Sequence, residues 1–161
     1  MRVKTVVMED FTNYKKPSMF IGCISCNGKC CTEGGHPLSV CINDQWRDAE
    51  IQTIDDDYLI TRYINNPITS AIVFGLLEPF EQFDELLNFV KSLRLTHNCN
   101  DEIVVFTGFS ESEISDKIHI LSQYKNIIVK FGRYVMGQEK HYDEVLGVYL
   151  ASDNQFGKVI S

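Results

Sequence analysis

Short continuous apolar runs and longer stretches with helical spacing alternate along most of the chain. Apolar runs at residues 3–8, 71–74, 103–106, 127–130 and 145–150 predict strands. Residues 53–64, 80–95 and 110–121 carry apolar side chains at helical intervals and predict the helices between them. Continuous apolar strands are typical of a parallel sheet that is buried on both faces. The alternation therefore predicts an α/β fold built from parallel βα units.

Polar residues mark where two of these helices begin. Asp55, Asp56 and Asp57 bring side-chain acceptors and negative charge to the start of the first helix. Ser110 and Glu113 have the spacing of a capping box at the start of the last helix. The sequence therefore indicates where the helices at 53–64 and 110–121 begin.

Residues 11–50 follow no sustained period and are rich in glycine and proline, which predicts a long loop. A loop of this length is unusual inside a compact domain unless something holds it in place. Metal binding can supply that stabilisation, because its free energy is coupled to folding.

Cysteines are crowded into the same segment. Five of the six lie within 23–41, namely Cys23, Cys26, Cys30, Cys31 and Cys41, while Cys99 lies apart. Disulfide frameworks join distant parts of small secreted domains, whereas a crowded thiol loop is typical of a metal site. Thiolates are soft ligands that suit iron–sulfur clusters or zinc.

Cys26 and Cys30 are four residues apart around Gly28, in a loop that can fold around a cluster. The third thiol is Cys41 or Cys31, and Cys41 is preferred because adjacent residues rarely ligate one small cluster together. Three ligands leave one iron open for substrate, whereas a structural cluster uses four.

Zinc is the alternative occupant of this loop. His36 with the same three thiols would complete a tetrahedral Cys₃His site. Spacing alone leaves the iron–sulfur and zinc interpretations equally open.

Two further polar segments directly follow predicted strands. Glu78 lies in the turn that begins at Gly75, and Thr107 follows the next strand along the chain. Parallel sheets place their sites beyond the carboxyl ends of the strands, and a carboxylate there can accept from a substrate ammonium group. Taken alone, each segment is equally consistent with an ordinary turn.

Composition narrows the class of protein. The 161 residues fit one domain over 1–161. The net charge of −7 weighs against nucleic-acid binding, which needs a basic face. No run of eighteen apolar residues occurs, so no membrane span is expected. The short apolar run near Met1 does not form a signal-peptide core, and a cytoplasmic location is expected.

In chain order, the motifs resemble the radical S-adenosylmethionine superfamily, and most of all the activating protein of anaerobic ribonucleoside-triphosphate reductase. The spacing of Cys26 and Cys30 matches the first two cysteines of that family, but position 33 is Glu33 where the third is expected. The segment 41–43 resembles the third cysteine after an insertion. The segments 75–79, 106–109, 131–134 and 152–155 resemble the family's Gly-Gly-Glu-Pro, Thr-Gly-Tyr, Gly-Arg-Phe and Ser-x-Asn-Gln motifs, with the second glycine of the first one missing.

The resemblance implies a partial (β/α) barrel of parallel strands with outer helices. It implies a [4Fe-4S] cluster held by Cys26, Cys30 and Cys41, and S-adenosylmethionine bound by Gly75, Glu78, Thr107 and Asn154. The implied activity is reductive cleavage of S-adenosylmethionine, which generates a glycyl radical on the reductase catalytic subunit. A flavodoxin-type reductant would supply the electron. The altered cysteine spacing leaves a non-catalytic zinc- or cluster-binding module as the alternative.

Overall fold

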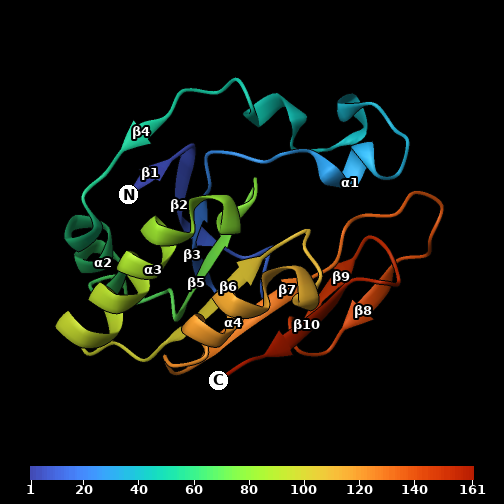
Figure 1. Cartoon of the computed structure of the whole chain (residues 1–161). Coiled ribbons are helices and arrows are strands. Elements are labelled where there is room, and N and C mark those ends of the chain that lie inside the picture. Colours follow the sequence, from blue (N-terminus) through green and yellow to red (C-terminus); the bar gives the residue numbers. More distant parts are fainter.

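A six-stranded mixed sheet forms the centre of the computed structural model, which describes residues 1–161 (Figure 1). Its strand order is β10-β7-β6-β5-β3-β2. The strands are β2 (Thr5–Asp10), β3 (Ser18–Gly22), β5 (Ala71–Gly75), β6 (Glu102–Phe106), β7 (Ile127–Phe131) and β10 (Phe156–Val159). The four central strands are parallel, and β2 and β10 pair antiparallel at the two edges.

The register brings the carboxyl ends of the parallel strands level with one another. Gly22 pairs with Gly75 at the end of β3 and β5, and Phe106 pairs with Lys130 near the end of β6 and β7. The segments that follow these four strands therefore meet at one edge of the sheet.

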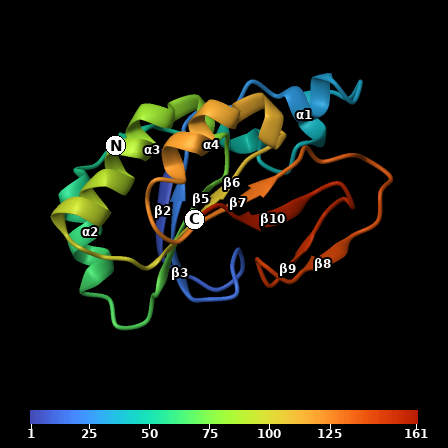
Figure 2. The ribbon, with the colours of Figure 1, turned by 60° about the horizontal axis from the view of Figure 1, so that its bottom comes forward.

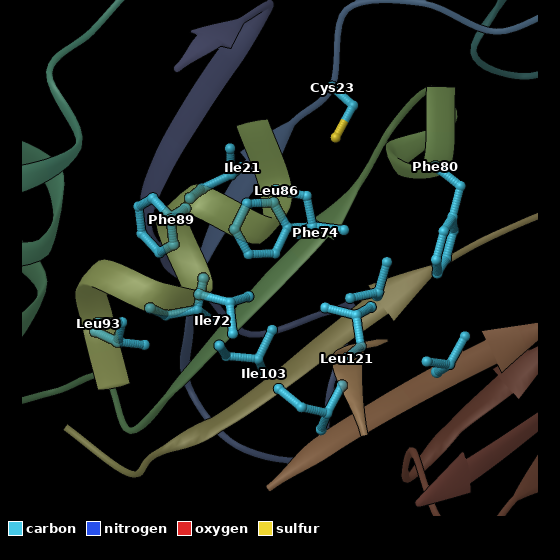
Figure 3. Packing of buried hydrophobic residues seen from close by; sticks show 14 of the residues in the cluster. Ile21, Cys23, Ile72, Phe74, Phe80, Leu86, Phe89, Leu93, Ile103 and Leu121 are labelled. Carbon is cyan, nitrogen blue, oxygen red and sulfur yellow. The ribbon is translucent and has the colours of Figure 1, made fainter. Parts of the chain in front are cut away.

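Helices cover one face of the sheet, as Figure 2 shows. They are α2 (Asp56–Ile64), α3 (Phe83–Lys91) and α4 (Ser115–Leu121). Short turns extend two of them: η3 (Pro79–Gln82) and the π-helical η4 (Ser92–Thr96) flank α3, and η5 (Glu111–Ile114) precedes α4. The main core lies between these helices and the sheet, with Phe74 of β5 edge-on to Phe89 of α3 at 5.3 Å (Figure 3).

A smaller core occupies the opposite face of the sheet. Phe20, Val73 and Val104 point to this face, where Tyr14 and Leu146 pack against them. The hairpin of β8 (His141–Asp143) and β9 (Val148–Leu150) lies on this side of the molecule (Figure 2). Both faces of the central strands are thus buried, which explains why these strands are continuously apolar.

The cysteine segment lies at the end of the sheet where the parallel strands finish (Figure 1). It contains only short elements: α1 (Lys29–Thr32), η1 (Leu38–Val40) and η2 (Asp44–Trp46). After this segment, β4 (Gln52–Thr53) pairs with β1 (Arg2–Val3), and the chain then enters α2. None of the helices has the length and apolar character needed to cross a membrane.

The mixed α/β fold is confirmed, together with the strands predicted at 71–74, 103–106 and 127–130 and the three helices. The sheet is open, and no closed barrel forms. It is also not built of parallel strands alone, because both edge strands run antiparallel. The strand predicted at 3–8 is divided in the structure, because Val3 belongs to β1 in a separate two-stranded sheet. The edge strand β2 carries an irregularity between Val7 and Asp10.

Two assignments at the level of elements are wrong. Residues 11–50 are not a single loop, because β3 (Ser18–Gly22) is a fully buried central strand. Its five residues are too few to establish a period between Pro17 and the cysteines. Of the strand predicted at 145–150, only β9 forms, outside the main sheet, whose edge is instead the weakly apolar β10.

Candidate functional site

Two hydrogen bonds to backbone carbonyls tie the cysteine segment to the turn after β5. The Glu78 N–H donates to the Ser25 carbonyl at 2.7 Å. The Asn43 side-chain amide donates to the Leu76 carbonyl at 2.6 Å. The cysteine segment and the turn after β5 therefore meet at one edge of the sheet.

Glu78 is the most tightly held polar side chain at this edge. One carboxylate oxygen accepts from the Thr107 hydroxyl at 2.8 Å and the Phe80 N–H at 3.1 Å, and the other accepts from the Gly108 N–H at 2.9 Å. The residue is 6% exposed. Burial raises the pKa of Glu78, and the three hydrogen bonds oppose that rise. The carboxylate thus has a fixed position and little contact with water.

Cys30 approaches this carboxylate through a gap that Gly108 leaves open. A Cβ atom on Gly108 would lie 2.9 Å from the Cys30 Sγ and 3.7 Å from a Glu78 carboxylate oxygen. Real Cβ atoms do not come so close to sulfur, so the missing side chain creates the space around the thiol. Cys30, Gly108 and Glu78 therefore share one small region.

A tight turn at Gly28 lies between Cys26 and Cys30. Gly28 has φ of 74°, in the left-handed region, and precedes α1. Its N–H lies 3.4 Å from the Cys26 Sγ. Arg47 donates to the Cys26 carbonyl at 2.7 Å, which fixes the turn from the far end of the segment. The turn between these two cysteines is therefore held at its Cys26 end by Arg47.

Of the two candidates for the third thiol, Cys31 lies near both Cys30 and Cys41. Cys41 follows η1 and is partly buried, whereas Cys31 is 5% exposed. Burial and the neighbouring Cys41 and Cys30 thiols raise the pKa of Cys31. The choice of Cys41 over Cys31 stays a prediction. Cys23 is fully buried and lies in the main core (Figure 3), so it is not proposed as a ligand.

No group of three or more His, Cys, Asp or Glu side chains converges as a single metal ion would require. A zinc site needs its ligands about 2.0–2.3 Å from one point. In this structure Cys26, Cys30, Cys41 and His36 do not surround one common point, and the zinc site stays an alternative prediction. In a cuboidal cluster each ligand thiolate binds a different iron, so the ligands surround a larger volume.

Lys130 is a site residue that sequence reasoning missed. It shares a strand face with Ile128 of the smaller core, and its ammonium donates to the Gly132 carbonyl at 2.8 Å. Burial lowers its pKa to about 8, although nearby Cys30 and Glu78 act to raise it. The sequence feature that could have indicated Lys130 is its charge, which stands alone in the apolar strand 127–131.

Arg133 is engaged in two ion pairs that join the cysteine segment to the start of α4. Its guanidinium lies 2.6 Å from Glu113 and 2.9 Å from Glu33, the residue that ends α1. The same group lies over the Phe109 ring at 5.7 Å. Arg133 thus fastens α1 against the sheet edge.

Replacing Glu113 by Gln is expected to remove an acid-sensitive part of this fastening. Hydrogen bonds from Arg133 and Ser110 lower the Glu113 pKa from 4.5 to about 2. A lowered carboxyl pKa contributes stability above pH 4.5, and that stability is lost as the pH falls through about 2. Glu113→Gln should therefore unfold more easily at pH 7, by on the order of 1 kcal/mol, with the difference vanishing in acid. Urea unfolding of the metal-free protein at several pH values measures this.

Glu111→Gln is the matched control. Glu111 lies in the same turn as Glu113 but forms an exposed ion pair with Lys158. Little change is expected there. An identical pH profile for Glu113→Gln and the original protein would contradict the role given to this ion pair.

Asn154 lies apart from the Glu78 group. Its amide donates to the Arg133 carbonyl at 2.9 Å, and Gln155 donates to the Gly132 carbonyl at 3.2 Å. Of the four residues predicted to bind the cofactor, the structure joins Glu78 directly to Thr107. Gly75 ends β5 at the same edge, with the Phe106 ring 3.3 Å from where its Cβ would be.

The cysteine segment and the Glu78 group both fall within one family match. The model of a family described as a 4Fe-4S single cluster domain matches residues 22–155. The chain belongs to this family. As a 4Fe-4S single cluster domain, it is an iron–sulfur protein, and the match covers every candidate ligand from Cys26 to Cys41. Comparison with curated proteins and with solved structures finds no match.

The residues present in this 4Fe-4S single cluster domain fit its cluster. Soft thiol donors are gathered on one segment, and Gly108 leaves room beside the Cys30 sulfur. Burial raises the pKa of the Cys26 thiol, and the nearby Arg47 guanidinium acts in the opposite direction.

Proposed function

We propose that this iron–sulfur domain is a radical S-adenosylmethionine activase that generates a glycyl radical on anaerobic ribonucleotide reductase. The observation that carries the proposal is the buried Glu78 carboxylate beside the Cys30 thiol. An electron-transfer domain needs only the cluster, whereas a fixed carboxylate next to a ligand thiol provides a place for a cationic group.

In the proposal, Cys26, Cys30 and Cys41 hold the [4Fe-4S] cluster. Three protein ligands leave one iron without a thiolate, which is the arrangement that a substrate-binding cluster requires. When bound and reduced, this cofactor supplies one electron that splits the sulfonium of S-adenosylmethionine into methionine and a 5′-deoxyadenosyl radical, which takes a hydrogen atom from a glycine.

The side chains around the cluster bind and orient the substrate. Glu78 accepts from the methionyl ammonium group, and the Thr107 hydroxyl and Gly108 N–H hold that carboxylate in position. Gly75 permits close approach at the end of β5. Asn154 supports the site through the Gly132–Arg133 turn, whose carbonyl it holds.

Leu76 lies in the segment that resembles the Gly-Gly-Glu-Pro motif and has a backbone conformation typical of glycine. Leu76 has φ of 72°, in the left-handed region that glycine favours. Such a conformation costs a non-glycine residue about 1 kcal/mol or more and persists only where its surroundings fix it. Here the Asn43 amide holds the Leu76 carbonyl. The glycine-like turn at Leu76, two residues before Glu78, supports the proposed cofactor site.

The fold in this proposal is radical S-adenosylmethionine-like, with the sheet as a partial barrel. The partner is the glycyl-radical catalytic subunit of anaerobic ribonucleotide reductase, and a flavodoxin-type protein is the electron donor. The partner's glycine would have to reach the edge of the sheet near Glu78.

Cleavage of S-adenosylmethionine by the purified protein tests this function. Protein reconstituted with iron and sulfide without oxygen, then mixed with dithionite and S-adenosylmethionine, is expected to release 5′-deoxyadenosine and methionine. Chromatography of the quenched mixture measures both products. A protein that carries its cluster but releases neither product would contradict the proposal and favour a non-catalytic cluster-binding module.

A further inference from the structure

Lys4, between β1 and β2, holds the chain on both sides of the cysteine segment. Its backbone N–H donates to the Gly22 carbonyl at 2.8 Å, at the end of β3 and directly before the segment. Its side-chain ammonium donates to the Arg47 carbonyl at 2.9 Å and to the Ala49 carbonyl, at the far end of the segment. One residue therefore fixes the distance between the two ends of this part of the chain.

The Lys4 side chain is buried, although it carries a polar group. Lys4 is 5% exposed. An ammonium group that is removed from water needs hydrogen-bond acceptors, because burial without them is costly. The Arg47 and Ala49 carbonyls supply these acceptors. An aliphatic side chain could fill the same space but could not bind the two carbonyls, because it has no donor.

The Arg47 side chain extends this connection to the first proposed ligand. Its Nη1 atom donates to the Cys26 carbonyl at 2.7 Å. The Asp44 carboxylate lies 3.1 Å from its Nε atom and orients the guanidinium. A Cβ atom on Gly28 would lie 3.3 Å from Nη2, so the guanidinium also packs against the turn that precedes Cys30. Arg47 therefore links the far end of the segment to the turn between the first two thiols.

We propose that Lys4 and Arg47 form a clamp that holds the cysteine segment in its cluster-binding conformation. The proposal rests on the proposed ligation by Cys26. Ordering a long loop costs conformational entropy, which the free energy of metal binding has to offset. A clamp made from the chain's own hydrogen bonds lowers that cost, because the loop is already ordered when the metal binds. Lys4 and Arg47 are positioning residues, and neither is proposed to contact iron or substrate.

Release of iron from the cluster-loaded protein to a ferrous chelator, measured without oxygen, tests the clamp. Arg47→Met loses the donor to the Cys26 carbonyl, so its iron should leave about tenfold faster. Lys4→Met should have a similar effect, because it frees the Arg47 backbone. Since both changes act on one connection, the double variant should lose iron within about twofold of the rate of Arg47→Met alone. Arg47→Lys keeps a cationic donor and should hold iron better than Arg47→Met.

Arg62→Met is the matched control, because it removes the same type of side chain from an exposed position of α2. It should release iron at the original rate. Arg47→Met with the original rate of release would overturn the proposal. Single effects that multiply in the double variant would also overturn it, because Lys4 would then not act through Arg47. Lys4→Gln replaces Lys4→Met if that variant does not fold.

Limited proteolysis of the metal-free protein separates the clamp from the cluster assignment. Leu38 packs against the same turn, since its Cδ2 atom lies 2.5 Å from where a Gly28 Cβ would be. Chymotrypsin should cut after Leu38 about tenfold faster in Arg47→Met than in the original protein or Arg62→Met. Equal rates of cutting would overturn the clamp. An original protein that binds no iron would overturn the proposed function, and proteolysis would still decide whether the clamp exists.

Discussion

Cys30→Ala is expected to abolish cluster binding, and Cys26→Ala and Cys41→Ala should do the same. Each removes one of the three proposed thiolates, and the remaining two leave two irons without a protein ligand. The Cys30 thiol is also the one that lies beside Gly108 and Glu78, so its loss separates the cluster from the substrate site. Iron and sulfide content after anaerobic reconstitution measures the effect.

Cys99→Ala is the matched control, because this thiol lies beyond η4 and far along the chain from the cysteine segment. It should bind a full cluster. Cys23→Ala should also keep its iron, although it loses a buried side chain from the main core. Full iron in Cys41→Ala together with its loss in Cys31→Ala would move the third ligand to Cys31.

Glu78→Gln is expected to weaken the binding of S-adenosylmethionine by roughly tenfold to a hundredfold while the iron content stays unchanged. The variant keeps the size of the side chain and loses the negative charge that accepts from the ammonium group. Hydrogen bonds to charged groups contribute about 1.5–3 kcal/mol, which corresponds to this range. Isothermal titration of the cluster-loaded protein with S-adenosylmethionine provides the measurement.

Asp84→Asn removes the same charge from the exposed first turn of α3 and serves as the control. It should bind S-adenosylmethionine as the original protein does. Unchanged affinity in Glu78→Gln would show that this carboxylate only caps η3, where it accepts from the Phe80 N–H.

Periodicity was sufficient for the elements with enough residues to show it. A clear apolar pattern with turn or capping residues beside it marks α2, α3 and the strands β5, β6 and β7. Strand β3 was missed because its five residues stand between a proline and a cysteine cluster, and their partner β5 lies about fifty residues further on. Edge strand β10 was missed because its exposed residues carry little hydrophobic pattern.

The site was predictable in part. Thr107 and Glu78 follow adjacent parallel strands, and the rule for strand ends is sufficient to bring them together. Lys130 and Gly108 could not be recognised in this way, because their importance depends on Cys30 arriving from a different segment. Asn154 shows the reverse case: its motif is polar and follows a strand, yet its amide holds the Arg133 backbone.

Iron and sulfide analysis of the protein purified without oxygen, with its absorption spectrum, tests the central claim most directly. The account predicts a brown protein with about four irons and about four sulfides per chain, as a cuboidal cluster requires. A colourless protein that carries one tightly held zinc and no iron would contradict it.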